Sequence, residues 1–476
     1  PSLPPNPGRH LYLTVVAELQ KFAIDRFGTE SGAAVVLDIE TGDILAFVST
    51  PAFDPNDFVN GISSADYAVL RDDVEYSPLY HKAYDGTYPP GSTFKMVVAA
   101  AALEAGVIDP NERVYCPGHY RFGNNTWHCW KRRGHGSVNM HWAIKSSCDV
   151  YFYEVARRMG IEHLADVSKR FGFGQRWELG LTGGRSGVVP NDEWKRAARG
   201  EPWVEGETLN VGSGQGQVST SPLQLAVMSA RIAAEGRIIT PRIIGEGPRP
   251  ESDIPYDAPL DPEFMKRMKA GMYGVTSEAG GTALRSGDLG LGGPRLAGKT
   301  GTSQVRRISA AERATGIRDG DDIARRLRDH ALFVAYAPHD DPKYAISVIV
   351  EHGEGGSKAA APVARAILDE ALRLESRRTA NYKRTETYGG KGGTGSGCPK
   401  RRQQPIKYTR FFSPISADPG ARSAMGADPD DLCHGDDWRC DLAFGNFYQS
   451  PGSRTSNAPG NTVCSRVGCA FDHRAC

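Results

Sequence analysis

The sequence predicts an α/β protein with one sheet, whose first and last strands come from opposite ends of the chain, and a helical insertion between them. Apolar runs of strand length occur at residues 32–38 and 44–49, and again at 330–337 and 344–351. Apolar stretches of helical length lie between the two pairs. This order predicts a mixed α/β sheet assembled from both ends of the chain.

The N-terminal part begins with a linker at residues 1–29. Its first seven residues are proline-rich, and residues 11–27 have the apolar spacing of an amphipathic helix. A buried strand at 32–38, a turn at 41–43 and a returning strand at 44–49 then predict a β-hairpin. Residues 51–90 are rich in proline, aspartate and tyrosine and are expected to be irregular.

The middle of the chain is mostly helical. A helix is expected to follow Ser92 and to end near Gly106, whereas residues 107–141 have a loop-like composition. Helices are expected within 142–171 and from 220 onward, separated by a glycine-rich loop at 209–217. A strand around Lys299, the hairpin at 330–351 and a helix at 360–374 complete the body. The body is expected to span residues 30–376.

Residues 377–476 differ in character from the body. They include a glycine-rich linker at residues 389–397 and contain six of the nine cysteines. They have neither helical nor strand periodicity, which predicts a disordered tail. A small cysteine-stapled module and an out-of-frame, non-native translation are the alternatives.

The bulk composition excludes some classes of function. The 476 residues carry a formal net charge of +1, which gives no support for nucleic-acid binding. The sequence contains no run of about 18 apolar residues, which is the length needed to span a membrane. Because the first residue is Pro1 and no signal peptide precedes the body, we expect the N-terminus to be incomplete and to lack an anchor or export signal.

Two short motifs carry the chemistry. Residues 90–95 (Pro-Gly-Ser-Thr-Phe-Lys) place Ser92 and Lys95 one helical turn apart, and residues 299–302 (Lys-Thr-Gly-Thr) supply a second amine. Serine is a weak nucleophile without a base, and a second cation together with burial can drive a lysine toward its neutral form. An isolated Ser-x-x-Lys is more often a helix cap followed by a solvated lysine. The joint pattern instead indicates a serine acyltransferase.

Four other residues have the donor types of a structural zinc site. Cys116, Cys129, His135 and Cys148 offer three thiolates and an imidazole, which suit tetrahedral zinc. The spacing lacks the paired C-x2-C arrangement, so a Cys116–Cys129 disulfide and unligated cysteines remain alternatives. His119, His128 and His141 compete for the histidine position. A metal here would attach the 107–141 loop to Ser147 and Asp149.

These motifs resemble the transpeptidase domain of class B penicillin-binding proteins over roughly residues 8–375. Residues 88–95 are similar to the first motif of that family, Ser147-Cys148-Asp149 to the second, and 299–302 to the third. Residues 212–216 and 220–226 are similar to another family stretch. The resemblance implies the penicillin-binding/β-lactamase-like transpeptidase fold, with a mainly antiparallel five-stranded sheet flanked by helices and an all-helical subdomain. Asp149 stands where the family commonly has asparagine, which puts the hydrogen-bond donor role of the amide in doubt.

The resemblance also implies roles for these residues. Ser92 would attack the D-Ala-D-Ala amide of a peptidoglycan stem peptide, with Lys95 taking its proton, and Ser147 would relay a proton to the leaving D-alanine. Lys299, Thr300 and Thr302, with Gly301 between the two threonines, would hold the terminal carboxylate. The backbone N–H groups of Ser92 and Thr302 would form the oxyanion hole. No cofactor is expected for this reaction, and β-lactams would acylate Ser92.

The resemblance further implies a role in cell-wall elongation and rod shape at the bacterial inner membrane, with the catalytic domain in the periplasm. The implied partners are a membrane glycosyltransferase and elongation-complex proteins. One rival interpretation is a serine β-lactamase. Residues 207–210 superficially resemble a deacylation motif, but Gly206 stands where the glutamate should be. The other rival is a non-enzymatic penicillin sensor or scaffold, which would not require the complete set of serine and lysine motifs.

Overall fold

The strands from the two ends of the body form one antiparallel sheet. The computed structural model describes residues 8, 10–59, 61–245, 259–290, 295–318 and 320–389. The sheet order is β2-β1-β9-β8-β7, and every neighbouring pair is antiparallel. The strands are β1 (Gly32–Asp38), β2 (Ile44–Thr50), β7 (Ala297–Ser303), β8 (His330–Ala337) and β9 (Tyr344–Val350). The prediction of one sheet built from both ends of the body is confirmed, and so is the five-stranded, mainly antiparallel sheet that the resemblance implied; the expectation of a mixed sheet is wrong, because all four pairs of neighbouring strands are antiparallel.

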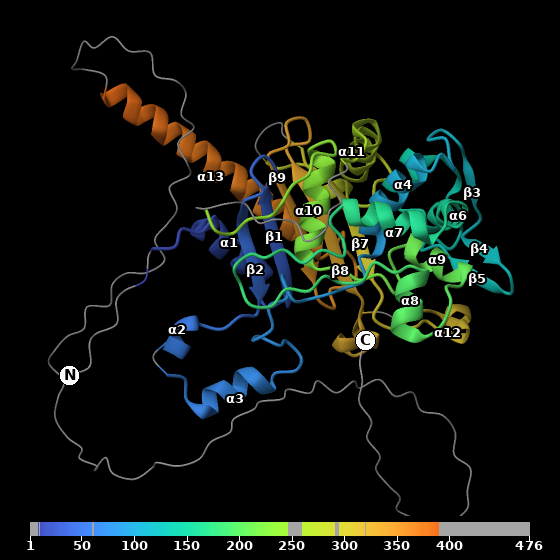
Figure 1. Ribbon diagram of the computed structural model, residues 1–476, viewed down its shortest axis with the longest axis horizontal. Coiled ribbons are helices and arrows are strands. Elements are labelled where there is room, and N and C mark those ends of the chain that lie inside the picture. The colour runs from blue at the N-terminus through green and yellow to red at the C-terminus, as the bar shows by residue number, and fades with distance from the viewer. Residues whose placement is uncertain are drawn as a thin grey trace, which may run out of the picture. The chain divides into compact units, whose positions relative to one another are not determined.

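Helices cover both faces of the sheet (Figure 1). Helix α10 (Pro222–Ala233) packs against β1, β8 and β9, while α1 (Ala17–Phe27) and α13 (Ala360–Gly389) pack against β2, β8 and β9 and against each other. The sequence starts α10 with a capping box, in which Ser221 accepts from the Gln224 N–H and Gln224 accepts from the Ser221 N–H. Every residue of α10 is buried, so this helix forms the centre of the core.

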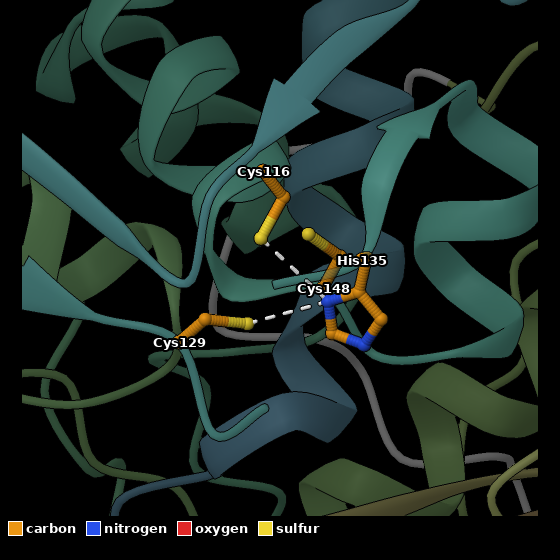
Figure 2. Close-up of side chains that lie close together, drawn as sticks. All are labelled: Cys116, Cys129, His135 and Cys148. Carbon is orange, nitrogen blue, oxygen red and sulfur yellow. Dashed lines mark hydrogen bonds between the residues drawn. The ribbon is translucent and has the colours of Figure 1, made fainter. Parts of the chain in front are cut away.

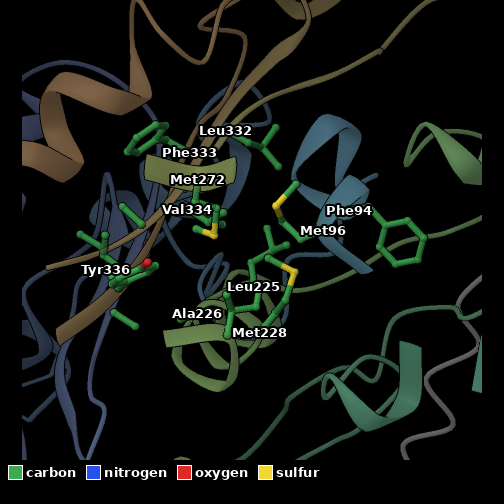
Figure 3. Close-up of a cluster of buried hydrophobic side chains, with 14 of the residues drawn as sticks. Phe94, Met96, Leu225, Ala226, Met228, Met272, Leu332, Phe333, Val334 and Tyr336 are labelled. Atoms are coloured by element: carbon green, nitrogen blue, oxygen red, sulfur yellow. The ribbon is translucent and has the colours of Figure 1, made fainter. Parts of the chain in front are cut away.

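The core joins the sheet to three helices, one of which begins with Lys95 of the first motif (Figure 3). Side chains from β8, α10, α4 (Lys95–Glu104) and α11 (Pro262–Ser277) belong to one buried cluster. Each of the three helices contributes at least one methionine, and the unbranched side chain of methionine suits an irregular junction. These methionines include Met96, Met228 and Met272.

The remaining elements lie mostly between β2 and β7 in sequence. The helices are α2 (Pro55–Val59), α3 (Ser64–Asp72), α5 (Met140–Lys145), α6 (Asp149–Met159), α7 (Ile161–Arg170), α8 (Asp192–Arg199), α9 (Glu205–Gly212) and α12 (Ala310–Thr315). The short 3-10 turns are η1 (Gly91–Phe94), η2 (Leu284–Ser286), η3 (Gly320–Asp322) and η4 (Arg325–Leu327). Two small ladders pair β3 (Val114–Cys116) with β6 (Gly136–Val138), and β4 (His119–Phe122) with β5 (Asn125–His128).

Several expected boundaries are wrong. Helix α1 begins at Ala17 instead of Leu11, because the preceding backbone bonds elsewhere: Thr14 donates its N–H to Ile243 O at 2.8 Å. Residues 51–90 contain α2 and α3, and the Ser63 side chain caps α3. The expected 209–217 loop begins within α9.

The last helix is longer than expected. Helix α13 continues to Gly389, past the expected end at 374 and past the 376/377 domain boundary. The rest of the expected tail, residues 390–476, lies outside the described residues. Within the described part, no helix combines the length and apolarity needed to cross a bilayer.

Candidate active site

The nucleophile candidate lies in a tight turn at the start of a buried helix. Ser92 belongs to η1, and the Lys95 N–H donates to the Ser92 carbonyl as α4 begins, so the two side chains are one turn apart. Gly91 has a φ of +54° and donates its N–H to Gly214 O at 2.8 Å. A Cβ at Gly91 would collide with the Thr302 carbonyl oxygen. Only glycine fits this position, and the close approach places the Ser92 turn against the third motif.

The second motif brings the two distant lysines together. Ser147 lies between α5 and α6 with a φ of +55°, an uncommon conformation for a non-glycine residue. Its Oγ accepts from Lys95 Nζ at 3.2 Å and from Lys299 Nζ at 2.9 Å. Both lysine side chains are fully buried. The three predicted motifs therefore meet at one hydroxyl oxygen.

Asp149 acts as an acceptor through both carboxylate oxygens. Its Oδ1 accepts from Lys95 Nζ at 2.6 Å, and its Oδ2 accepts from the Trp130 N–H at 2.8 Å. Burial raises the pKa of Asp149, and the Lys95 ammonium opposes that shift. An aspartate in place of the common asparagine thus gives Lys95 a charged partner.

The third motif provides a buried amine that forms no ion pair with a carboxylate of the described residues. Lys299 Nζ donates to Ser147 Oγ and to Thr300 O, the latter at 2.9 Å. Burial first, and the Lys95 charge second, hold the pKa of Lys299 well below its usual value. Lys95, in contrast, has the Asp149 carboxylate beside it, with 2.6 Å between Nζ and Oδ1.

Strand β7 lies at the edge of the sheet, and the side chain of Gln215 binds to part of its open side. Gln215 Nε2 donates to Thr302 O at 2.8 Å, and Gln215 Oε1 accepts from the Gln304 N–H at 3.3 Å. The Thr302 carbonyl therefore faces the open edge. In an antiparallel strand the N–H of the same residue faces the same way, which is the direction the predicted oxyanion hole requires.

The four predicted metal-binding residues converge (Figure 2). The ligand atoms of Cys116, Cys129, His135 and Cys148 all lie within 4.8 Å of one another. His135 Nδ1 is 3.7 Å from Cys116 Sγ and 3.4 Å from Cys129 Sγ. The three thiols are free, so the alternative Cys116–Cys129 disulfide does not form in the structure.

Trp130 links this cysteine cluster to the second motif. It follows Cys129 directly and donates its N–H to Asp149. Its indole Nε1 donates to Ser146 O and Ser147 O, both at 3.1 Å. No motif in the sequence pointed to Trp130, because nothing in the local pattern shows which backbone carbonyls an indole will reach.

Comparison with known proteins shows the family to which this chain belongs. Residues 32–369 match the penicillin binding protein transpeptidase domain. The chain belongs to this family. It is 38% identical over 383 residues to the peptidoglycan D,D-transpeptidase MrdA of Haemophilus influenzae, covering 78% of this chain and 57% of that protein. It is 36% identical over 379 residues to MrdA of Escherichia coli K12, covering 78% and 59%.

Solved structures of this transpeptidase family have the same fold. Pseudomonas aeruginosa PBP2 in complex with WCK 5153 is similar with a TM-score of 0.67 and 40% identity, over 77% of this chain and 76% of that chain. Helicobacter pylori PBP2 in complex with MreC gives a TM-score of 0.69 at 34% identity, over 77% and 64%. The chain spans slightly less than 60% of the length of these two MrdA relatives.

A polar cluster beyond the end of β7 contains a half-buried histidine. His330 pairs with Ser303 across the sheet, stacks edge-on against Tyr88 and accepts from the His352 N–H at 3.0 Å. Tyr88 in turn donates to Glu351 Oε1 at 2.8 Å. Burial foremost, with the neighbouring His352, lowers the pKa of His330 to about 4.

This shift predicts a pH dependence of stability. Between pH 6.5 and about 4 the unfolded chain binds a proton at His330 that the folded chain does not, so stability falls as the pH falls through this window. At 1.36 kcal/mol per pKa unit, the full loss is about 3 kcal/mol. We expect the thermal midpoint of His330→Asn to change less than that of the wild type when it is measured from pH 7 to pH 4. The exposed-histidine control His10→Asn should retain the wild-type slope, and an unchanged slope in His330→Asn would contradict this assignment.

Proposed function

We propose that this chain is the catalytic part of a peptidoglycan D,D-transpeptidase that cross-links stem peptides through an acyl-enzyme on Ser92. The observation that carries the proposal is the meeting of Lys95 and Lys299 at Ser147 Oγ, with the Ser92 turn packed against Thr302. The matching transpeptidase domain and the MrdA relatives support it.

In the acylation step Ser92 Oγ attacks the carbonyl carbon of the penultimate D-alanine. Lys95, one turn away, takes the hydroxyl proton. The N–H groups of Ser92 and Thr302 stabilise the developing oxyanion. Lys299 with Thr300 and Thr302 holds the terminal carboxylate, and Gly301 lets the strand pack closely: a Cβ there would lie 2.9 Å from the Thr93 methyl group.

Ser147 completes the proton transfer. Its hydroxyl lies between the two amines and passes a proton to the nitrogen of the leaving D-alanine as the amide bond breaks. An amine of a neighbouring stem peptide then attacks the acyl-enzyme and loses its proton by the same route, which forms the cross-link and restores Ser92. A β-lactam supplies an amide whose leaving group stays attached, so its adduct on Ser92 persists.

Mass spectrometry after penicillin treatment tests the proposal. We expect one adduct on the peptide that contains Ser92 and none in Ser92→Ala. The control Ser168→Ala, which removes a buried helix hydroxyl bonded to Leu164 O, should be labelled like the wild type. An unlabelled wild-type protein, or a labelled Ser92→Ala, would refute the transpeptidase proposal.

A β-lactamase is less well supported because the one glutamate in a suggestive sequence context is fully engaged. Glu207 accepts from Lys195 Nζ at 2.8 Å, from the Val204 N–H at 2.9 Å and from Gln217 Nε2 at 3.0 Å. Glu207 therefore stabilises the start of α9 and is not available to activate a water molecule. Slow release of the penicillin adduct is expected, and rapid nitrocefin turnover would favour the rival.

We further propose that the full-length protein acts in cell-wall elongation and rod-shape maintenance at the bacterial inner membrane, with this domain in the periplasm. Two structural neighbours support partners of this type. One is the Helicobacter pylori PBP2–MreC complex, and the other is a peptidoglycan synthase complex that coordinates polymerization and crosslinking. Elongation-complex proteins and a membrane glycosyltransferase are thus the proposed partners.

We also propose that Cys116, Cys129, His135 and Cys148 hold a structural zinc ion. Zn–S bonds of about 2.3 Å in a tetrahedron place donor atoms roughly 3.5–3.8 Å apart. The two distances from His135 Nδ1, 3.7 and 3.4 Å, are close to this range. The three thiols are close enough to share protons: hydrogen bonding from Cys129 and Cys148 lowers the pKa of Cys116, and the same contacts raise the pKa of Cys148. A bound cation would favour the thiolate form of all three. The zinc would be structural, because all four positions are protein ligands.

A further inference from the structure

Thr282 contacts the third motif although it lies in a different part of the chain. Its Oγ1 is 2.7 Å from Oγ1 of Thr300. Thr300 is 9% exposed, and Thr282 is partly exposed in the loop after α11. No motif in the sequence pointed to Thr282. The contact therefore gives a second hydroxyl to the part of the site where the donor carboxylate is proposed to bind.

The backbone on both sides of Thr282 is fixed to α11. The Gly281 N–H donates to Glu278 O at 2.9 Å, and the Ala283 N–H donates to Val275 O at 3.0 Å. A Cβ at Gly281 would collide with the carbonyl oxygens of Gly274 and Val275. A hydroxyl held between two such anchors has a defined position, which a contact from a free loop would lack.

Glu278 ties the same loop to the helix that precedes the second motif. Its Oε2 accepts from Lys145 Nζ at 2.9 Å and lies 3.0 Å from His141 Nε2. The Lys145 ammonium also lies 3.6 Å from the centre of the Trp142 ring. Helix α5 leads directly into Ser146 and Ser147. The loop that carries Thr282 is therefore held against the second and the third motif.

The strand geometry places Thr300 where an oriented hydroxyl is useful. Side chains alternate along β7, so Thr300 and Thr302 share one face while Lys299 points to the other. A hydroxyl that accepts from a neighbour keeps its own proton for another acceptor. If Thr282 donates to Thr300, the Thr300 O–H is free to donate to a carboxylate.

We propose that Thr282 is a positioning residue that orients the Thr300 hydroxyl toward the terminal carboxylate of the donor peptide and of β-lactams. The inference rests on the proposed transpeptidase function. Thr282 strengthens carboxylate binding before acylation and takes no part in proton transfer. Its removal therefore weakens the apparent affinity and leaves the limiting acylation rate unchanged.

A pair of probes that differ only at the carboxylate tests the proposal. Benzylpenicillin and its methyl ester are each reacted with the protein, and adduct formation is followed over a range of concentrations. The wild type is expected to prefer the free carboxylate. We expect Thr282→Val to lose about tenfold in apparent affinity for benzylpenicillin, with little change for the ester, as for one lost hydrogen bond to a charged group. Thr282→Ser should restore the preference.

Two further variants separate positioning from stability. Thr282→Ala removes the hydroxyl without a second methyl group, and should behave like Thr282→Val. Thr276→Val is the control: it removes a buried hydroxyl that donates to Leu296 O at 2.7 Å. That variant should melt at a lower temperature and keep the wild-type ratio between the two probes.

The inference is overturned if Thr282→Val and Thr282→Ala slow both probes equally, or slow neither. It is also overturned if Thr276→Val changes the ratio as much as they do. A wild-type protein that forms no adduct with either probe would instead refute the proposed transpeptidase function.

Discussion

Lys95→Ala is expected to slow penicillin acylation by about 10³-fold while the fold is retained, within the usual contribution of a general base. The Lys95 amine is fully buried and holds Ser147 O, Ser147 Oγ and Asp149 at 3.0, 3.2 and 2.6 Å. Its loss removes the base one turn from Ser92 and leaves the Asp149 carboxylate without its cation. Labelling with a fluorescent penicillin, followed over time, measures the effect.

Lys82→Ala is a matched control for Lys95→Ala. Lys82 is also a buried lysine, 1% exposed, whose pKa is lowered by burial. Its Nζ donates to Ser77 O at 3.2 Å, and it takes no part in the proposed mechanism. We expect this variant to lose stability and to keep labelling. Wild-type labelling of folded Lys95→Ala would contradict the base assignment, and equal losses in both variants would point to damage from losing any buried lysine.

Loss of the proposed zinc is expected to destabilise the body and to slow acylation together. His135→Ala should reduce bound zinc from about one per chain to less than about 0.1. A loss of several kcal/mol, at about 2 °C per kcal/mol for a chain of this size, should lower the thermal midpoint by about 10 °C. Acylation should slow because Cys148 lies between Ser147 and Asp149, and Cys129 precedes Trp130.

His119→Ala is the control for the metal prediction. His119 lies on β4 of the same region but outside the cluster that contains Cys116, Cys129, His135 and Cys148. This variant should retain zinc, melting behaviour and labelling. The zinc content is measured by metal analysis of protein purified without chelator. Less than about a tenth of a zinc ion per wild-type chain would contradict the proposal. Unchanged melting of metal-free protein would show that the ion is not structural.

The sheet and its connections could be predicted because their signals are local. Strand β1 was predicted at residues 32–38, which are its bounds, and β8 matches the predicted run at 330–337. Each is an apolar run bounded by turn residues, so period and length were sufficient. The Ser92–Lys95 spacing likewise followed from one turn of helix.

Other elements depended on contacts that no local pattern reveals. Helices α2 and α3 lie in a stretch rich in proline and aspartate, and their apolar residues are largely exposed, so helical periodicity was weak there. The start of α1 was misplaced because residues before Ala17 bond to the distant segment that contains Ile243. Long-range pairing of this kind overrides a favourable local pattern.

The sequence by itself determined the chemistry available to this protein: a serine with a lysine one turn away, a Lys-Thr-Gly-Thr strand, and three cysteines with a histidine. Only the tertiary structure decided which carboxylate lies beside which amine: Asp149 pairs with Lys95, and among the described residues no carboxylate forms an ion pair with Lys299. It also decided which side chains support the motifs, such as Trp130 and Thr282. Spacing along the chain fixes which groups exist, whereas pKa values and hydrogen bonds depend on distances across the fold.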